Sequence, residues 1–285
     1  MTELRSLSKT SFEEIYETWE DAFGGYARTW TRTELAKDLF RRGYVPELSF
    51  GAFDGNKLIC FTLNGIGFVN GKMTAYDTGT GTVKEHSGQG LATTVFNHSL
   101  PYLKEAGVQQ YILEVLQNNM KAVSMYTKVG FRILRGLNYF TQSMSEIKLN
   151  GKTLNSNYRI ESIGLERKHE MQLMWDFIPS WQNSFDAISR KPEDFKILGA
   201  FENTKLIGYG IVEPNSGDIS QLAVDKLYRR KGIGSALLKE LLKQNEHNSM
   251  KVINTEESNE PMTVFLEHNS ISKRGSQFEM TREIE

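Results

Sequence analysis

Apolar residues recur every three or four positions near the start of the chain and then alternate more tightly, which predicts helices followed by strands. The first predicted helix begins after Ser11, a residue type that caps helix starts. Asp54-Gly55 joins two apolar runs and is a strong hairpin signal, because both residue types tolerate positive φ. After a short opening strand, the first half is predicted to contain helices over 11–19 and 31–42, strands over 48–53, 57–62 and 73–78, a helix over 88–105 that Pro101 bends or interrupts, a strand over 111–115, a helix over 120–128 and a strand over 131–139.

The second half shows the same order of elements. Its predicted elements are a strand over 158–163, helical material over 168–189, a hairpin across 202–204, a strand over 219–224, a helix over 232–244, a strand over 251–255, a helix over 261–267 and a closing strand over 277–282. Between the halves, residues 143–157 are polar and turn-rich. We therefore expect an N-terminal domain over 1–145, a linker over 146–157 and a C-terminal domain over 158–285.

An internal repeat supports this division. Residues 51–59 and 199–207 share six identities in nine, at an offset of 148 (199 minus 51). Two glycine-rich loops, 87–92 and 229–234, follow in the same order at an offset of 142 (229 minus 87). A repeat of this length exceeds the roughly 20 to 50 residues of solenoid units, so it indicates two copies of one globular fold. We predict that each copy is a mixed sheet with helices packed on it, which places the fold in the α/β (α+β) class.

Composition narrows the function classes. The formal net charge is -1, from 34 Lys plus Arg and 35 Asp plus Glu, so no global field attracts nucleic acid or an anionic membrane. Cys60, the only cysteine, lies in an apolar run and is interpreted as a buried hydrophobe, and the five histidines lack the spacing of a metal site, so we expect no metal. The N-terminus lacks a signal peptide and no run is long enough to span a membrane, so we expect a soluble, cytoplasmic protein.

Both glycine-rich loops lead from a predicted strand into a predicted helix. Such a turn presents free backbone N–H groups at the positive end of the helix dipole, which makes it a site for an anion. Glycines let a diphosphate approach the main chain, and Arg229, Arg230 and Lys231 add positive charge to the second loop. The glycine spacing fits neither a P-loop nor a dinucleotide fingerprint.

In its surroundings, the segment 224–238 resembles the acyl-CoA pyrophosphate loop and helix of the GNAT family of N-acetyltransferases. The segment 119–131, in which Tyr126 precedes Gly130-Phe131, resembles the next segment of that family. The resemblance implies two tandem GNAT-like domains, each a mixed, mostly antiparallel sheet flanked by helices, and acetyl-CoA as acyl donor. It assigns acetyl-CoA binding to Thr82, Val83, Ser87, Gly88, Gln89, Gly90, Leu91, Ala92 and Asn119 in the first half, and to Val224, Arg229, Arg230, Lys231, Gly232, Ile233, Gly234 and Ser235 in the second.

The two halves depart from the family pattern in different places. Ser87 stands where the family usually has Arg or Gln, while Gly88, Gly90 and Ala92 still fit. In the second half Leu266 takes the place of Tyr126, and Ser270-Ile271 replaces the Gly-Phe pair. The first half therefore keeps the better acid and the second keeps the better anion loop.

Acetyl transfer to an amine needs a base for the amine, donors for the oxyanion and a proton for the leaving thiolate. The resemblance implies that Tyr126 lies near the thioester sulfur as the acid, and that backbone N–H groups around Thr82, Val83 and Val224 meet the oxyanion. Two carboxylates compete as the base: Glu114, which interrupts an apolar strand, and Asp77, on the strand before the loop. Their counterparts, Asn254 at offset 140 (254 minus 114) and Ile219 at offset 142 (219 minus 77), cannot act as bases.

We therefore expect an acetyl-CoA-dependent N-acetyltransferase acting on a primary amine, with its chemistry in the N-terminal domain. Two alternatives stay open: catalysis in the C-terminal domain, and a non-enzymatic acyl-CoA-binding or sensing module. The acceptor, whether a small molecule or a peptide, is not encoded in these motifs, because acceptor pockets are built from variable loops. The oligomeric state is equally open.

Overall fold

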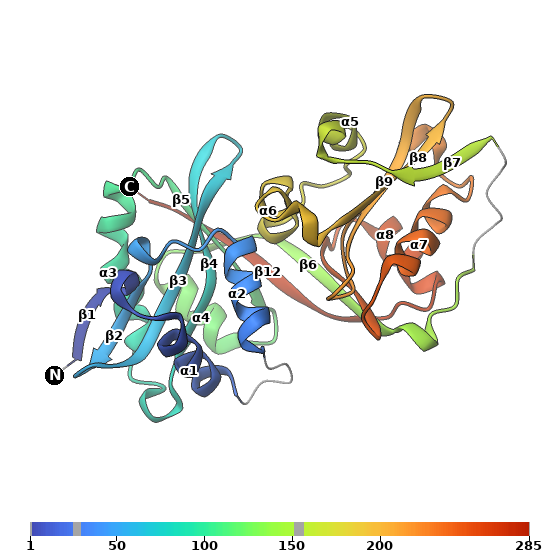
Figure 1. Ribbon diagram of the computed structural model, residues 1–285. Coiled ribbons are helices and arrows are strands. Elements are labelled where there is room, and N and C mark those ends of the chain that lie inside the picture. Colours follow the sequence, from blue (N-terminus) through green and yellow to red (C-terminus); the bar gives the residue numbers. More distant parts are fainter. Residues whose placement is uncertain (1, 25–29, 151–156, 285) are drawn as a thin grey trace. The chain divides into compact units, whose positions relative to one another are not determined.

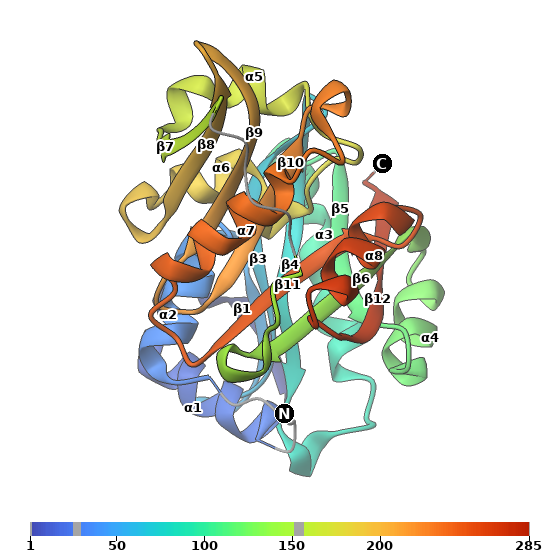
Figure 2. The same cartoon turned by 90° about the vertical axis from the view of Figure 1, so that its right-hand side faces the viewer.

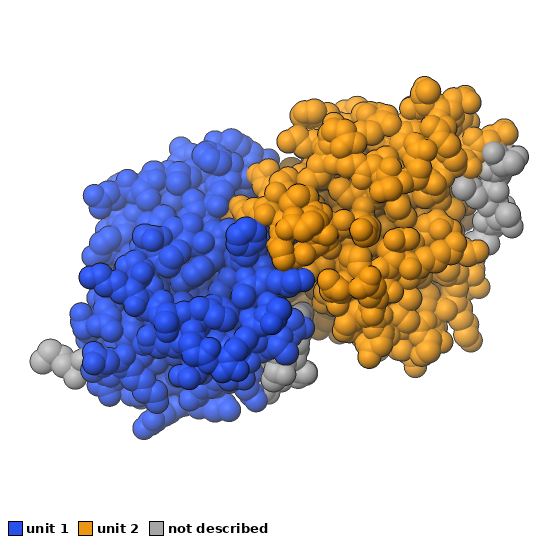
Figure 3. Space-filling view, viewed as in Figure 1, with its two compact units in different colours: residues 1–134, 279–285 blue, residues 135–278 orange. Residues whose placement is uncertain are grey.

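The computed structural model describes residues 2–24, 30–150 and 157–284, which form two compact units (Figures 1 and 3). Unit 1 contains residues 1–134 and 279–285, and unit 2 contains residues 135–278. In the described part of the chain each unit combines one mixed sheet with flanking helices. The predicted α/β (α+β) class is confirmed.

Unit 1 follows the predicted order closely. Its strands lie side by side in the order β1-β2-β3-β4-β5, with the end of β12 beside β5. β2 and β3 form the hairpin predicted at Asp54-Gly55, with Asp54 opposite Lys57. The elements are β1 (Thr2–Ser6), α1 (Phe12–Phe23), α2 (Arg32–Arg41), β2 (Phe50–Asp54), β3 (Lys57–Val69), β4 (Lys72–Thr82), α3 (Leu91–Glu105), β5 (Gln110–Leu116), α4 (Met120–Lys128) and the start of β6 (Arg132–Ser143).

The first two helices of unit 1, α1 and α2, begin where the sequence offers caps. The Ser11 side chain accepts the Glu14 N–H at the start of α1, and Thr31 and Glu34 form a capping box at the start of α2. α3 runs through Pro101 without a break, so an interruption there is excluded. The helices cover a sheet whose strands are apolar on both faces.

β3 supplies both cores of unit 1. Leu58, Phe61 and Leu63 pack with the residues of α1 and α2, whereas Ile59 and Cys60 pack with Val95 of α3 and its neighbours. Cys60 is fully buried, and this burial raises the pKa of its thiol to about 11. The interpretation of Cys60 as a buried hydrophobe is confirmed.

Unit 2 repeats this arrangement (Figure 2). Its strands lie in the order β12-β6-β11-β10-β9-β8-β7. Figure 1 shows α5 and α6 on one side of β9 and α7 and α8 on the other. The elements are β7 (Tyr158–Ser162), α5 (Lys168–Gln172), α6 (Phe185–Ser189), β8 (Lys196–Glu202), β9 (Lys205–Glu213), β10 (Asp218–Val224), α7 (Ile233–Gln244), β11 (Ser249–Glu256), α8 (Glu260–His268) and β12 (Lys273–Glu283).

One predicted element of unit 2 is wrong over most of its length. Helical material was expected throughout 168–189, but α5 and α6 hold five residues each, and the twelve residues between them form no α-helix. Pro179 lies in this stretch and has no N–H to offer a helix, and it also disfavours the helical conformation at Ile178. The irregular stretch brings Met174, Trp175 and Asp176 to a pocket wall.

The compact units divide the chain differently from the expected domains 1–145 and 158–285. β6 leaves unit 1 after Leu134, and its later residues pair with β11 from Leu137 opposite Glu256 to Ser143 opposite Ser249. In return, the last residues of β12 belong to unit 1, where the Ile284 N–H donates to the Gln109 oxygen at 2.9 Å. Each unit is thus completed by a strand from the other half of the sequence. Half of the expected linker, residues 151–156, lies outside the described residues.

This exchange predicts that the last strand stabilises the protein strongly. Met280 in β12 is fully buried, and truncating such a side chain leaves a cavity, so we expect Met280→Ala to lower the free energy of unfolding by about 2–5 kcal/mol. Urea unfolding followed by circular dichroism measures this change. The matched control is Leu134→Ala in β6, where the side chain is 54% exposed and a change within about 0.5 kcal/mol is expected. A similarly small change for Met280→Ala would contradict the packing of β12.

No helix in the described ranges is both long and apolar enough to cross a membrane.

Candidate active site

Two neighbouring strands of unit 1 separate beside the expected catalytic residues. β4 and β5 pair in parallel at Thr74, Ala75 and Tyr76, which lie opposite Gln110, Tyr111 and Ile112, and no further pair joins them within the described residues. Asp77 follows the last paired residue of β4, and Glu114 lies two residues beyond the last paired residue of β5. We call the place where pairing stops the fork of unit 1. Both candidate bases therefore lie at this fork.

Asp77 and Tyr126 are in direct contact. The Tyr126 hydroxyl donates to Asp77 Oδ2 at 2.9 Å, and the Thr80 hydroxyl donates to the same oxygen at 2.8 Å. Burial raises the pKa of the Asp77 carboxyl above its ordinary value, although the donors from Thr80, Tyr126 and the Gly79 N–H lower it. A buried carboxyl that shares a hydrogen bond with a phenol is suited to proton transfer.

Glu114 has a different partner. The Tyr76 hydroxyl donates to Glu114 Oε2 at 2.9 Å. Tyr76 is buried, and this burial together with the charge of Glu114 raises the pKa of its phenol well above the ordinary value. The phenol therefore stays protonated and keeps donating to Glu114. Of the two expected bases, Asp77 is the one that contacts Tyr126.

The two glycine-rich loops have the same backbone design. Gly88 and Gly90 in unit 1, and Arg230 and Gly232 in unit 2, all have positive φ and keep the offset of 142. Gly90 precedes α3 and Gly232 precedes α7, both in the left-handed conformation. Neither helix receives a side-chain cap at this residue, and neither has an acidic residue in its first turn. Their first N–H groups and dipoles are thus available to an anion.

The hydrogen-bond pattern of β4 shows which of the expected oxyanion donors, Thr82 or Val83, is already engaged in the sheet. The Val83 N–H donates to the Ile59 oxygen at 3.0 Å, so it is engaged in the sheet. Because bonds alternate along an antiparallel pair, Thr82, opposite Cys60, directs its N–H away from β3 and toward the fork. In unit 2 the Asp225 N–H likewise bonds to Ile207, and Val224 lies opposite Gly208. The expected role therefore suits Thr82 and Val224 but not Val83.

Asn119, which was expected to contribute to acetyl-CoA binding, caps a helix. Its side chain accepts the Ala122 N–H at the start of α4 at 3.2 Å, and Asn259 accepts the Met262 N–H at the start of α8 at the same distance. The two residues keep the offset of 140 (259 minus 119) and nearly identical backbone angles. We interpret both as helix caps that set where these helices begin.

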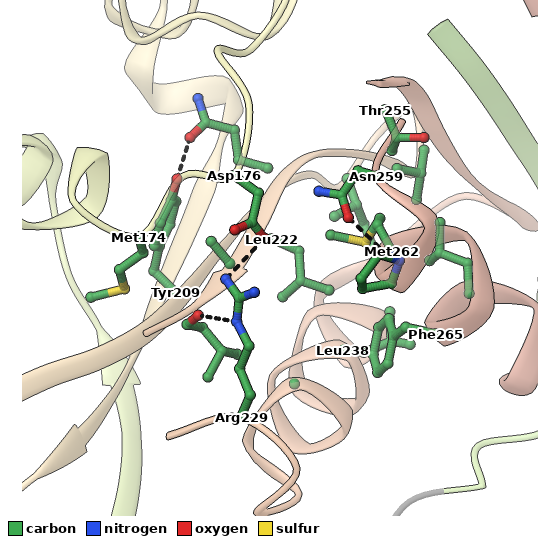
Figure 4. A pocket seen from close by; sticks show the side chains of 18 of the residues that line it. Met174, Asp176, Tyr209, Leu222, Arg229, Leu238, Thr255, Asn259, Met262 and Phe265 are labelled. Carbon is green, nitrogen blue, oxygen red and sulfur yellow. Dashed lines mark hydrogen bonds and ion pairs between the residues drawn. The ribbon is translucent and has the colours of Figure 1, made fainter. Parts of the chain in front are cut away.

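Unit 2 contains a pocket of about 680 Å³ at its own fork. β10 and β11 pair at Asp218 and Lys251, and no other pair joins them in the described part of the chain. Figure 4 shows Met174 and Tyr209 on one side of the pocket and Leu238, Met262 and Phe265 on the other. The expected loop residues Arg229, Arg230, Gly232, Ile233, Gly234 and Ser235 also line it, together with Val224 and Asn259.

The acid and base positions of unit 1 are occupied by other residue types in this pocket. Ile219, Asn254 and Leu266 all line it and all are buried. The Asn254 amide donates to the Ser180 hydroxyl at 2.9 Å. The pocket thus has the expected loop without the acid and base of unit 1.

Arg229 is held by a residue that the sequence did not single out. Its Nη2 lies 2.9 Å from Asp176 Oδ2, and its Nε donates to the Val224 oxygen at 3.0 Å (Figure 4). Lys226 lies 3.7 Å from the same carboxylate. The sequence analysis did not single out Asp176, because it placed this residue in a predicted helix and not in a pocket wall. Thr80 and Tyr76 were missed as well, although both lie within three residues of Asp77 in the sequence.

Comparison with known proteins agrees with this geometry. The model of the Acetyltransferase (GNAT) family matches residues 12–131 and 157–269, which together make up most of the chain. The chain therefore belongs to the GNAT family of acetyltransferases, and the predicted enzyme class is confirmed.

The individual proteins that this chain resembles share only part of its length or a small fraction of its residues. N-alpha-acetyltransferase 30 of Schizosaccharomyces pombe is 34% identical over 87 residues, which are 30% of this chain and 58% of that protein. The chain thus matches little more than half the length of this relative. A tandem GNAT protein from the clavulanic acid biosynthesis pathway superimposes with a TM-score of 0.75 at 13% identity, over 100% of this chain and 99% of that one. A GCN5-related N-acetyltransferase from Sphaerobacter thermophilus gives 0.74 at 13% identity, over 99% and 96%. At these identities the likeness shows the tandem fold alone.

Proposed function

We propose that this chain transfers an acetyl group from acetyl-CoA to a primary amine, and that unit 1 carries the chemistry. The observation that supports this most directly is the hydrogen bond of 2.9 Å between Tyr126 and Asp77 at the fork of unit 1. The Schizosaccharomyces pombe relative is by name an N-alpha-acetyltransferase, so a peptide α-amine is one acceptor class beside small amines. The loop and first turn of α3 suit the diphosphate of the donor, because their N–H groups carry no side-chain cap.

The pair can carry a proton from the amine nitrogen to the leaving sulfur. An alkylamine has a pKa near about 10.4 and must lose a proton, and the raised pKa of Asp77 makes its carboxylate a stronger base than an exposed aspartate. Tyr126 gives its phenol proton to the leaving thiolate. The protonated Asp77 then returns a proton to the Tyr126 oxygen along their hydrogen bond. The ammonium loses two protons in becoming an amide: one is released to solvent, and the other passes through Asp77 and Tyr126 to the thiol, so both side chains end in their starting forms.

Glu114 has a role in acceptor binding in this scheme and does not act as the base. Its carboxylate lies at the same fork but is bound by Tyr76 rather than by Tyr126. We propose that it orients or attracts the cationic acceptor amine, with Asp77 as the base. The Thr82 N–H is the proposed oxyanion donor, because it faces the fork where β4 has lost its partner.

A matched pair of variants tests which unit binds the acetyl-CoA that reacts. Ala92 and Gly234 occupy the same place in the first turns of α3 and α7. An aspartate there suits the helix dipole but repels a diphosphate, so we expect Ala92→Asp to raise the KM for acetyl-CoA at least about tenfold. Steady-state kinetics measure this, with Ala92→Ser as the uncharged control. If Gly234→Asp raises the KM and Ala92→Asp does not, the chemistry lies in unit 2.

A further inference from the structure

We infer that the pocket of unit 2 binds an acyl-CoA whose acyl group is longer than acetyl, and holds it without transferring it. This site is separate from the proposed reaction in unit 1. The inference depends on three features of the pocket: an end suited to phosphate, an apolar end, and other residue types at the positions of the unit 1 acid and base.

The start of α7 suits the phosphate end of such a ligand. Gly232 is left-handed and gives no side-chain cap, so the first N–H groups of the helix are available. Arg229, Arg230 and Lys231 precede it, and no acidic residue lies in the first turn. A Cβ at Gly234 would be in ordinary contact with Phe265 and Val224, whose nearest atoms lie at 3.6 Å and 3.7 Å, so a side chain can be placed at this position of the pocket without a clash.

A buried hydroxyl in the pocket wall independently indicates a ligand. The Thr255 side chain is 4% exposed, and its Oγ1 has no hydrogen-bond partner among the described residues. Figure 4 shows Thr255 beside Asn259 in the residues that line the pocket. Thr255 follows an irregularity in β11, where the register shifts between Ile253 and Thr255. An unpaired buried hydroxyl costs free energy, and a ligand carbonyl would satisfy it.

The other end of the pocket is apolar. The pocket reaches from the core cluster of α7 and α8, which includes Leu238 and Leu266, to the cluster of α5 and α6, which includes Met174 and Tyr209. Trp175 packs against Phe185 with ring centroids 5.4 Å apart and adds to the second cluster. The pocket of about 680 Å³ includes the loop end and continues beyond it between the two apolar clusters. An acyl chain of several carbons fits this end.

The polar groups at the apolar end already have partners. The Trp175 indole donates to the Tyr209 hydroxyl at 2.6 Å, and that hydroxyl donates to Gln221 Oε1 at 2.6 Å. The Gln221 amide donates to the Asn183 oxygen at 2.6 Å, and the Asn183 amide donates to the Ile253 oxygen at 2.7 Å. This chain of hydrogen bonds fixes the wall and leaves its apolar surface to the ligand.

The pocket also lacks the acid and base of unit 1. Among the described residues that line it, the one carboxylate is Asp176, which is paired with Arg229 and Lys226, and the one imidazole is His268, whose Nε2 lies 3.0 Å from the Asn150 oxygen. The positions that hold Asp77, Glu114 and Tyr126 in unit 1 hold Ile219, Asn254 and Leu266 here. An amine beside a bound thioester would meet no carboxylate or phenol at these positions to take its proton or to protonate the thiolate, so the acyl group stays on the sulfur.

Calorimetric titration of the full chain tests the inference. Titrations of acetyl-CoA and of hexanoyl-CoA into the Ala92→Asp chain, in which the donor loop of unit 1 is blocked, report on unit 2. Each buried methylene contributes about fourfold in affinity, so four additional methylenes give an upper bound of about 250-fold. We expect hexanoyl-CoA to bind at least about tenfold tighter than acetyl-CoA. Equal affinities, or no binding of either, would overturn the proposal.

Variants of the pocket separate its two ends. Gly234→Asp in the same background should weaken both ligands at least about tenfold, whereas Met174→Gln should weaken hexanoyl-CoA and leave acetyl-CoA nearly unchanged. Met174→Leu, which keeps an apolar side chain, is the matched control, and thermal unfolding checks that each variant is folded. If Met174→Gln affects both ligands equally, the acyl chain does not reach the apolar end.

Thiol release tests whether the acyl group is held. Hexanoyl-CoA is incubated with the Ala92→Asp chain and a panel of amines, and free thiol is followed with a thiol reagent, to which buried Cys60 gives little background. Release no faster than in buffer supports a holding site, and turnover would overturn it. A failure of acetyl transfer in unit 1 leaves this binding unaffected, so the two proposals are distinguishable.

Discussion

Replacing Asp77 with asparagine is expected to lower kcat for acetyl transfer by about a hundredfold to ten thousandfold, the range that a positioned acid or base contributes. The amide has the same shape and can still accept from Thr80 and Tyr126, so the fold should persist, but it cannot take the amine proton. Release of CoA thiol against amine concentration measures kcat, and circular dichroism checks the fold. Glu114→Gln is the matched comparison, because it removes the other carboxylate of the fork.

The pH profile sharpens this experiment. Burial raises the pKa of Asp77, and activity requires its deprotonated form, so the rate falls as the pH drops through a value above the ordinary aspartate range of about 3.9. That acid limb should disappear in Asp77→Asn. If Glu114→Gln removes activity and the acid limb while Asp77→Asn retains both, Glu114 is the base.

Replacing Tyr126 with phenylalanine is expected to lower kcat about a hundredfold at neutral pH, because the thiolate loses its proton donor. The loss should shrink at alkaline pH, where a thiol with a pKa near about 8.5 leaves readily as the thiolate. Tyr126 also lowers the pKa of Asp77 by donating to it, so the acid limb should move to higher pH in the variant. Full pH–rate profiles of both proteins measure these effects.

Affinity for acetyl-CoA serves as the internal control for Tyr126→Phe. The ring remains, and its edge-to-face contact with Phe131 at 5.6 Å should keep α4 in place. A variant that loses affinity instead of kcat would make Tyr126 a packing residue. A variant with wild-type kcat at every pH would remove it from the mechanism.

Local signals in the sequence predicted the loops and their helices well. Gly90 and Gly232 were singled out as loop glycines that let an anion approach the main chain before a helix, and the structure adds that both have positive φ. Ser11 and Thr31 likewise marked helix starts that the structure has. Such features depend on a few neighbouring residues, so one sequence contains the information.

Contacts between distant residues were not predictable in the same way. Asp77 and Tyr126 are 49 positions apart, and both Asp77 and Glu114 fitted the sequence pattern of a base. Only the alternation of hydrogen bonds in β4 separated Thr82 from Val83. The pairing of Asp176 with Arg229 and the exchange of β6 and β12 depend on the tertiary fold, which residue spacing does not report.

Because β6 and β12 are exchanged, neither half of the sequence contains all the strands of one compact unit. A chain ending near residue 145 would keep most of β6 without its partner β11, and would lack residues 279–284, including the buried Met280. Neither half can therefore be lost in evolution without damaging the other, even when it no longer catalyses. A half retained for folding is free to lose its acid and base, and its pocket can then be selected for a different ligand.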